Sequence, residues 1–187
     1  MSSYVDDLLH AYSKFVALPW QRNLAPPQRV WMAVYPPENE RRLRLWVPEF
    51  GTATHRQGHP WALVDITTTF EIWMASHRYR DAYFEDPELL ETALPAFFDH
   101  LVDDVRIRLA EHPDPDGVVG LLGAGTLFGL GAAVKVSALV NAVSDAVAGR
   151  LLVFFPGEHS GHSYRLLDAR DGWNYQATPI TPDGSSR

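Results

Sequence analysis

Hydrophobic residues near the N-terminus recur at intervals of three and four, which is the spacing of one face of an α-helix. The pattern predicts an amphipathic helix that begins near Ser2 or Ser3, because a serine side chain can accept a hydrogen bond from the first free amide groups of a helix. The positions that define its apolar face are Val5, Leu8, Leu9, Tyr12, Phe15 and Val16.

Short runs of consecutive apolar residues further along the chain have the length and composition of buried β-strands. They predict four strands over residues 29–35, 61–66, 118–122 and 150–155. Two more short strands at a sheet edge are predicted over residues 164–167 and 173–178.

The segments between these runs have helical periodicity. They predict a short helix over residues 38–45 with a second helix opened by Pro48, a broken helical stretch over 69–111, and a helix through 134–147. Alternation of strands and helices is typical of a mainly parallel sheet with helices on both faces. We therefore predict a single three-layer α/β domain over residues 1–180, resembling a P-loop NTPase-like core without the phosphate-binding loop. A flexible C-terminal tail is expected at 181–187.

Such domains bind ligands at the carboxyl ends of their strands, so the residues that follow each strand are the first candidates for a site. The first strand is followed by Pro36-Pro37-Glu38-Asn39-Glu40. The prolines remove backbone donors, and the glutamates place negative charge where a phosphate would lie. Neither Lys14 nor Lys135 stands in a Gly-Lys-Ser/Thr motif. The sequence excludes ATP hydrolysis by the P-loop mechanism, and no cofactor is expected.

Two other strand ends carry partial nucleotide-binding patterns. The loop Gly123-Ala-Gly125-Thr-Leu-Phe-Gly129 has one residue too many for a dinucleotide fingerprint, and Asp145 falls inside a predicted helix rather than at a strand end. We interpret these glycines as tight packing between strand and helix. Asp65 follows four apolar residues, as a magnesium-binding aspartate does, but without a phosphate loop it is interpreted as a turn residue.

Composition narrows the function classes further. The chain has no cysteine, which excludes disulfides, thiolate metal sites and cysteine nucleophiles. Its 16 basic and 23 acidic residues give a net charge of −7, which disfavours direct DNA binding and attraction to anionic membranes. Residues 117–134 carry no charge, but six are glycines, so a strand, a glycine turn and the start of a helix explain the run better than a membrane span.

Two loops combine tryptophan, tyrosine and arginine, the residue types that anchor protein interfaces. Trp20 and Arg22 follow the first helix, and Arg170, Trp173 and Tyr175 lie in the stretch 168–175, which links the last two predicted strands and includes the start of the second. These five residues are candidates for partner binding. The alternative is that each tryptophan packs onto its own domain and Arg170 pairs with an aspartate.

Four stretches of the chain resemble the BrxB family of bacterial BREX phage-defence systems. They are Leu-Pro-Trp-Gln-Arg-Asn at 18–23, Arg-Val-Trp-Met-Ala-Val-Tyr at 29–35, Leu-Leu-Val-Phe-Phe-Pro-Gly-Glu at 151–158 and Tyr-Arg-Leu-Leu-Asp-Ala-Arg-Asp-Gly-Trp-Asn-Tyr at 164–175. The last stretch is long and specific, and it is the main support for the resemblance. The resemblance extends from the first helix to about residue 180. The glycine-rich region at residues 123–133 is longer than in the family pattern, and the loop with His159 and His162 is not part of that pattern, so neither is given a family role.

The resemblance implies a small cytoplasmic accessory protein without catalytic residues. Such a protein works beside an adenine methyltransferase, a large BrxC-like ATPase and a PglZ-like protein in host DNA methylation and phage restriction. Its expected role is to bind the PglZ-like protein, the ATPase or both, and self-association into a homodimer stays open.

Two other functions remain as alternatives. A metal-dependent hydrolase or nuclease would use Asp65, Asp168 and Asp171 with His159 or His162, and it requires these side chains to converge in one coordination sphere. A DNA-binding component would use the helical arginine clusters at residues 41–44, 78–80 and 106–108, although their acidic neighbours favour salt-bridged surfaces.

Replacing Trp173 by alanine tests the partner-binding hypothesis. If Trp173 anchors a partner, the variant keeps its fold and loses complex formation, because truncation of a tryptophan anchor commonly weakens binding by about 2 kcal/mol or more. Size-exclusion chromatography of the complex and circular dichroism of the free variant provide the two readouts. A variant that simply unfolds would place Trp173 in the core instead.

Overall fold

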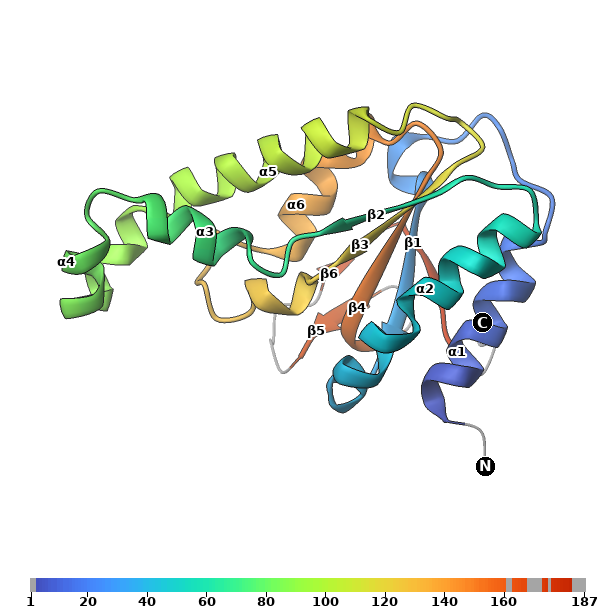
Figure 1. Cartoon of the computed structure of the whole chain (residues 1–187), viewed down its shortest axis with the longest axis horizontal. Coiled ribbons are helices and arrows are strands. Elements are labelled where there is room, and N and C mark those ends of the chain that lie inside the picture. Colours follow the sequence, from blue (N-terminus) through green and yellow to red (C-terminus); the bar gives the residue numbers. More distant parts are fainter. Residues whose placement is uncertain (1–2, 161–162, 168–172, 175, 183–187) are drawn as a thin grey trace.

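The computed structural model describes residues 3–160, 163–167, 173–174 and 176–182, with backbone alone at 173–174. A mostly parallel sheet lies between two layers of helices (Figure 1), which confirms the predicted three-layer α/β fold. Because the central strands are covered on both faces, their side chains are apolar in runs of consecutive positions rather than in alternate ones.

Five parallel strands form the main sheet, in the order β2-β3-β4-β1-β7. β4 extends past the end of β1, and this last part of β4 pairs antiparallel with β5. β5 in turn pairs with β6. The strands are β1 (Val30–Tyr35), β2 (Trp61–Asp65), β3 (Val118–Leu122), β4 (Arg150–Ser160), β5 (Ser163–Leu166), β6 (Trp173–Asn174) and β7 (Thr178–Ile180).

The helices divide the apolar side chains into two cores, one on each face of the sheet. On one face α1 (Tyr4–Val16) and α2 (Glu40–Arg56) pack against the sheet. On the other face lie α5 (Leu94–Ala110) and α6 (Val136–Val143), while α3 (Thr69–Ser76) and α4 (Arg80–Glu85) extend beyond the sheet (Figure 1). Short 3-10 segments, η1 (Pro26–Arg29), η2 (Pro37–Asn39), η3 (Pro87–Thr92), η4 (Ala124–Leu127) and η5 (Ser144–Ala146), join these elements.

The first helix begins where the sequence places it. The Ser3 side chain accepts a hydrogen bond from the Asp6 amide, and the Asp6 carboxylate accepts one from the Ser3 amide, so both free donors are satisfied. Tyr12 faces the core and its hydroxyl lies 2.6 Å from the Thr54 hydroxyl on α2. Burial raises the pKa of Tyr12, so this contact joins the two helices through neutral groups.

The prediction of two helices separated at Pro48 is wrong, because α2 runs continuously through this proline. Pro48 lies on the exposed side of the helix, whereas Val47, Phe50 and Ala53 are buried against the sheet. A proline inside a helix costs about 3 kcal/mol, and burying a Val or Phe side chain gains about 1.5–3 kcal/mol each. Packing on both sides of Pro48 therefore outweighs the missing backbone hydrogen bond.

The strand predictions are correct in the centre of the sheet, and the short strand predicted over 164–167 is confirmed as β5, but two other edge predictions differ from the structure. The segment at residues 61–66 is an edge strand, with Leu63 and Asp65 exposed, rather than a buried one. The single strand predicted over 173–178 is two elements, because β6 pairs with β5 whereas β7 returns to pair in parallel with β1. Strand position at an edge depends on contacts between distant segments, which local periodicity does not encode.

The uncharged run at residues 117–134 contains β3, η4 and a series of turns, and α6 begins shortly after it at Val136. The interpretation as strand and glycine turn is confirmed. In the part of the chain that the structure describes, no helix is long and apolar enough to cross a membrane.

The indole of Trp61 occupies a slot that two glycines leave open. A Cβ atom added to Gly51 on α2 would lie 2.7 Å from Trp61 Cδ1, and one added to Gly120 on β3 would lie 2.7 Å from Trp61 Cη2. These distances are too short for real contacts. Trp61 therefore fixes the spacing between α2 and the β2–β3 edge of the sheet.

We expect Gly120→Ala to lower the free energy of unfolding by about 1–3 kcal/mol, because the added methyl group must displace the indole. The measurement is urea denaturation of this variant, of Trp61→Leu and of the double variant. The double variant should lose less than the sum of the two single losses, since a smaller side chain at position 61 makes room for the methyl group. Strictly additive losses would contradict the contact.

Candidate functional site

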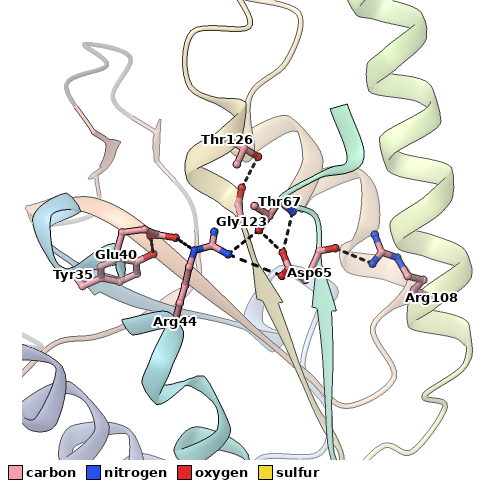
Figure 2. A network of polar contacts seen from close by, with 8 residues as sticks. All are labelled: Tyr35, Glu40, Arg44, Asp65, Thr67, Arg108, Gly123 and Thr126. Atoms are coloured by element: carbon pink, nitrogen blue, oxygen red, sulfur yellow. Dashed lines mark hydrogen bonds and ion pairs between the residues drawn. The ribbon is translucent and has the colours of Figure 1, made fainter. Parts of the chain in front are cut away.

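The strand ends that the fold makes available for ligands carry a network of polar side chains (Figure 2). Tyr35 ends β1, Asp65 ends β2 and Gly123 follows β3. Glu40 and Arg44 project from the first turns of α2, the helix that follows β1. Parallel strands end at the same edge, so the fold brings these residues together although they are far apart in sequence.

Arg44 is the centre of this network. Its Nε donates to Glu40 Oε1 at 2.7 Å, and its Nη1 donates to the Thr67 hydroxyl at 2.9 Å. The same Nη1 lies 4.0 Å from Asp65 Oδ2. All three charged side chains are about one-third to one-half exposed, so solvent screens their attraction.

The Tyr35 hydroxyl donates a hydrogen bond to Glu40 Oε2, the carboxylate oxygen that Arg44 leaves free. Burial raises the pKa of Tyr35, and the hydrogen bond to the Glu40 carboxylate raises it further. Tyr35 is therefore a neutral donor that holds Glu40 in place, not a base.

Asp65 organises the turn after β2. Its Oδ1 accepts hydrogen bonds from both the amide, at 2.9 Å, and the hydroxyl of Thr67. Its backbone carbonyl accepts a hydrogen bond at 3.0 Å from Arg108 on α5. This Asx-turn confirms that Asp65 is a turn residue.

Gly123 has a left-handed backbone with φ of +100°, and a Cβ atom there would lie 2.6 Å from the Thr67 amide nitrogen. Its carbonyl accepts a hydrogen bond at 2.7 Å from the Thr126 hydroxyl. The loop opens the short 3-10 segment η4 rather than α6, so this glycine allows close approach to the β2–α3 turn and not the packing of a strand on a helix.

Together these contacts form a clasp, which we define as Tyr35, Glu40, Arg44, Asp65, Thr67 and Gly123. It ties the ends of β1 and β2 to α2, and Gly123 at the end of β3 lies close against Thr67. The charged groups of the clasp are engaged with one another and with Thr67, and this arrangement orients the side chains although they are partly exposed.

The proposed metal-ligand set is only partly described. Asp65 ends the edge strand β2, whereas His159 lies near the end of β4, with β3 between them. His162, Asp168 and Asp171 lie outside the described residues. Within the described ranges no three His, Asp or Glu side chains are grouped closely enough to hold a metal ion.

The partner-binding candidate Trp20 packs onto its own domain. Its indole stacks on the His59 ring at 3.7 Å between centroids, and its Nε1 donates to the Val16 carbonyl at 3.1 Å. The Arg150 guanidinium lies 4.8 Å from the Trp20 ring. Trp20 is half-buried by these contacts, as the alternative interpretation expects, and its role in partner binding stays a prediction.

The other four candidates differ in what the structure describes. Arg22 is highly exposed and forms a 3.6 Å ion pair with Asp116. Trp173 is described only by its backbone, which pairs with Tyr164 in β5 and β6. Arg170 and Tyr175 lie outside the described residues. Their role in partner binding stays a prediction.

Two residues near Trp20 were missed by sequence reasoning. Arg150 begins β4 and is buried, with its Nη2 donating to the Gln21 carbonyl at 2.6 Å. Burial lowers the pKa of Arg150, and the nearby charge of Arg29 lowers it further. A single charged residue at the start of an otherwise apolar strand was the available signal for Arg150. Nothing local marks His59.

The arginine clusters form mostly salt-bridged helix surfaces, as their acidic neighbours indicate. Arg106 makes a two-point contact with Asp145, at 2.6 and 3.1 Å, which raises the pKa of Arg106 and lowers that of Asp145. The remaining pairs are Arg42–Asp6, Arg44–Glu40, Arg80–Asp81 and Arg108–Asp104.

A pocket of about 530 Å³ lies at the opposite, amino-terminal end of β2 and β3. Trp61 and Leu109 give it apolar walls, and Glu111, His112 and Asp114 lie in the loop at its rim. The pocket is thus separated from the clasp by the length of the strands.

Comparisons with protein-family models, with curated proteins and with solved structures give no match to this chain. The fold class is thus defined by the strand order and the two helical layers, as a mostly parallel α/β domain.

The clasp predicts that Gly123→Ala is more costly than Gly129→Ala. Both glycines have positive φ, so each alanine variant should lose about 1–2 kcal/mol of unfolding free energy from backbone strain. Only Gly123→Ala adds a clash, because a Cβ at Gly129 has no atom within 4 Å. Thermal and urea denaturation of both variants provide the measurement. Equal losses would contradict the close approach of Gly123 to Thr67.

Proposed function

We propose that this chain is a non-catalytic accessory protein of a BREX-type phage-defence complex. In this proposal it acts in the cytoplasm and binds a PglZ-like protein, a BrxC-like ATPase or both. Its contribution is assembly of the complex that supports host DNA methylation and phage restriction.

The observation that carries the proposal is the state of the strand-end site. An enzyme of this fold class needs a base, acid or phosphate-binding amides directed at a substrate at this edge. Here Arg44 joins Glu40 to Thr67, and Asp65 is bound by Thr67. A site whose charged groups are used to hold strand ends together supports a scaffold rather than a catalyst.

The BREX assignment rests on the resembling stretches alone. No family model matches the chain. Two of these stretches coincide with β1 and most of β4, the neighbouring strands at the centre of the sheet. A third, residues 18–23, contains Trp20 and the Gln21 carbonyl that Arg150 binds. The resemblance therefore concerns segments that contact one another in the fold.

Affinity purification from cells carrying the whole neighbouring operon tests this proposal. We expect stoichiometric recovery of the PglZ-like protein or the BrxC-like ATPase, identified by mass spectrometry, and co-elution in size-exclusion chromatography. Defence should persist in a strain that produces Asp65→Asn, because amide oxygen can still accept the turn hydrogen bonds.

Two results would count against the proposal. Recovery of the chain alone at low salt would remove the assembly role. A rise in melting temperature with a divalent metal, abolished by Asp65→Asn, would favour the metal-dependent hydrolase instead.

A further inference from the structure

The helical segment at residues 69–92 extends to one side of the sheet, at the left of Figure 1. We call this segment, which comprises α3, α4 and η3, the helical arm. Its base is anchored to the core, because Trp73 and Phe70 contact Phe97 on α5 with ring centroids 5.3 and 5.0 Å apart. Met74 is the last buried residue of the arm.

The outer part of the arm has no core of its own. Neither α4 nor η3 contains a buried residue, and every side chain from Ala75 to Thr92 is exposed or half-buried. A helix of six residues and a 3-10 segment are too short to be stable in water without packing. Leu90 packs against the main core, and a covering partner would supply packing that the rest of this part lacks.

The arm also exposes large apolar side chains. Of the nine that are exposed in the described part of the chain, four lie here: Ile72, Tyr79, Phe84 and Leu89. Phe84 is 73% exposed, while the neighbouring Tyr83 contacts the His77 ring at 5.2 Å and is half-buried. Apolar side chains grouped on one projecting segment mark an interaction surface, unlike those scattered singly elsewhere.

The charge on the arm is strongly negative. The segment contains six acidic residues and only two arginines, and both arginines have partners within the arm. Arg80 pairs with Asp81 at 3.3 Å, and Arg78 lies over the Tyr79 ring at 4.4 Å. Among the described ion pairs none involves the outer acidic side chains Glu85, Asp86, Glu88 and Glu91.

We infer that the helical arm is a docking surface for a basic, apolar segment of a partner protein. Lysine or arginine side chains of the partner would meet the outer acidic residues, and its apolar side chains would cover Phe84 and Leu89. Nucleic acid and anionic membrane are repelled by the same charge, and so is the arm of a second copy. This inference rests on the proposed assembly function and names the surface that performs it.

Variants at exposed positions test the inference without disturbing the fold. Phe84→Ser removes the most exposed apolar side chain of the arm, and the double variant Glu85→Lys/Glu88→Lys removes its net negative charge. Leu45→Ser and Glu49→Lys on α2 are matched controls, since Leu45 is 76% exposed and Glu49 is also exposed. In operon co-purification we expect each arm variant to lower partner recovery on the order of tenfold, and the α2 variants to leave it unchanged.

A second measurement uses a defined probe, a synthetic amphipathic helix with leucine on one face and lysine on the other. Binding of this peptide should raise the melting temperature of the wild-type protein and of both α2 variants. The rise should be lost in Phe84→Ser and in the double lysine variant, and it should decrease as salt is added.

The outcomes separate this inference from the proposed function. If wild-type protein recovers its partners and the arm variants recover them equally well, the arm inference is overturned and the assembly function stands. If wild-type protein recovers no partner, the assembly function fails, and equal peptide binding by arm and α2 variants would overturn the arm inference independently. A concentration-dependent dimer that Phe84→Ser abolishes would assign the arm to self-association and also overturn it.

Discussion

The structure depends on the burial of β4 on both of its faces. Leu151, Val153 and Phe155 point into the core beneath α5 and α6, and Leu152 and Phe154 point into the core beneath α1 and α2. β4 also pairs with β3 on one side and β1 on the other. Loss of either helical layer would leave half of this strand in contact with water. The clasp and the anchor of the helical arm are both positioned by elements that pack on this one sheet.

The sequence predicts the parts of the molecule that are determined by neighbouring residues. The apolar run before Pro36 forms β1, Ser3 caps α1, and Asp65 forms a turn with the threonine two positions later, because each of these depends on local spacing. Arg44 could not be found this way, since its role follows from the side-by-side placement of α2 and the end of β2. The prediction that a helix ends before Pro48 is wrong for the same reason. The helix continues only because the residues around Pro48 pack against a distant sheet.

The two ends of α5 illustrate a division of labour in this fold. Near its C-terminal end Arg108 binds the Asp65 carbonyl and thereby covers part of the open edge of β2. Near its N-terminal end Phe97 supports the aromatic base of the helical arm. Through Arg108, α5 covers part of the open edge of β2. Through Phe97, it supports the base of the helical arm. The polar groups of the clasp hold the strand ends in place, whereas the helical arm exposes apolar and acidic side chains.

The pairing of β1 with β7 has a consequence for the order of folding. It joins residues 31–33 to residues 178–180, so closing this edge brings together segments separated by nearly all the rest of the domain. During synthesis β1 emerges early and must wait for Ile180, which is buried beside it. We therefore expect the other strand pairs to form first, while this edge of β1 stays open to intermolecular pairing in the nascent chain. The nascent chain is therefore most exposed to aggregation in the interval before β7 pairs with β1.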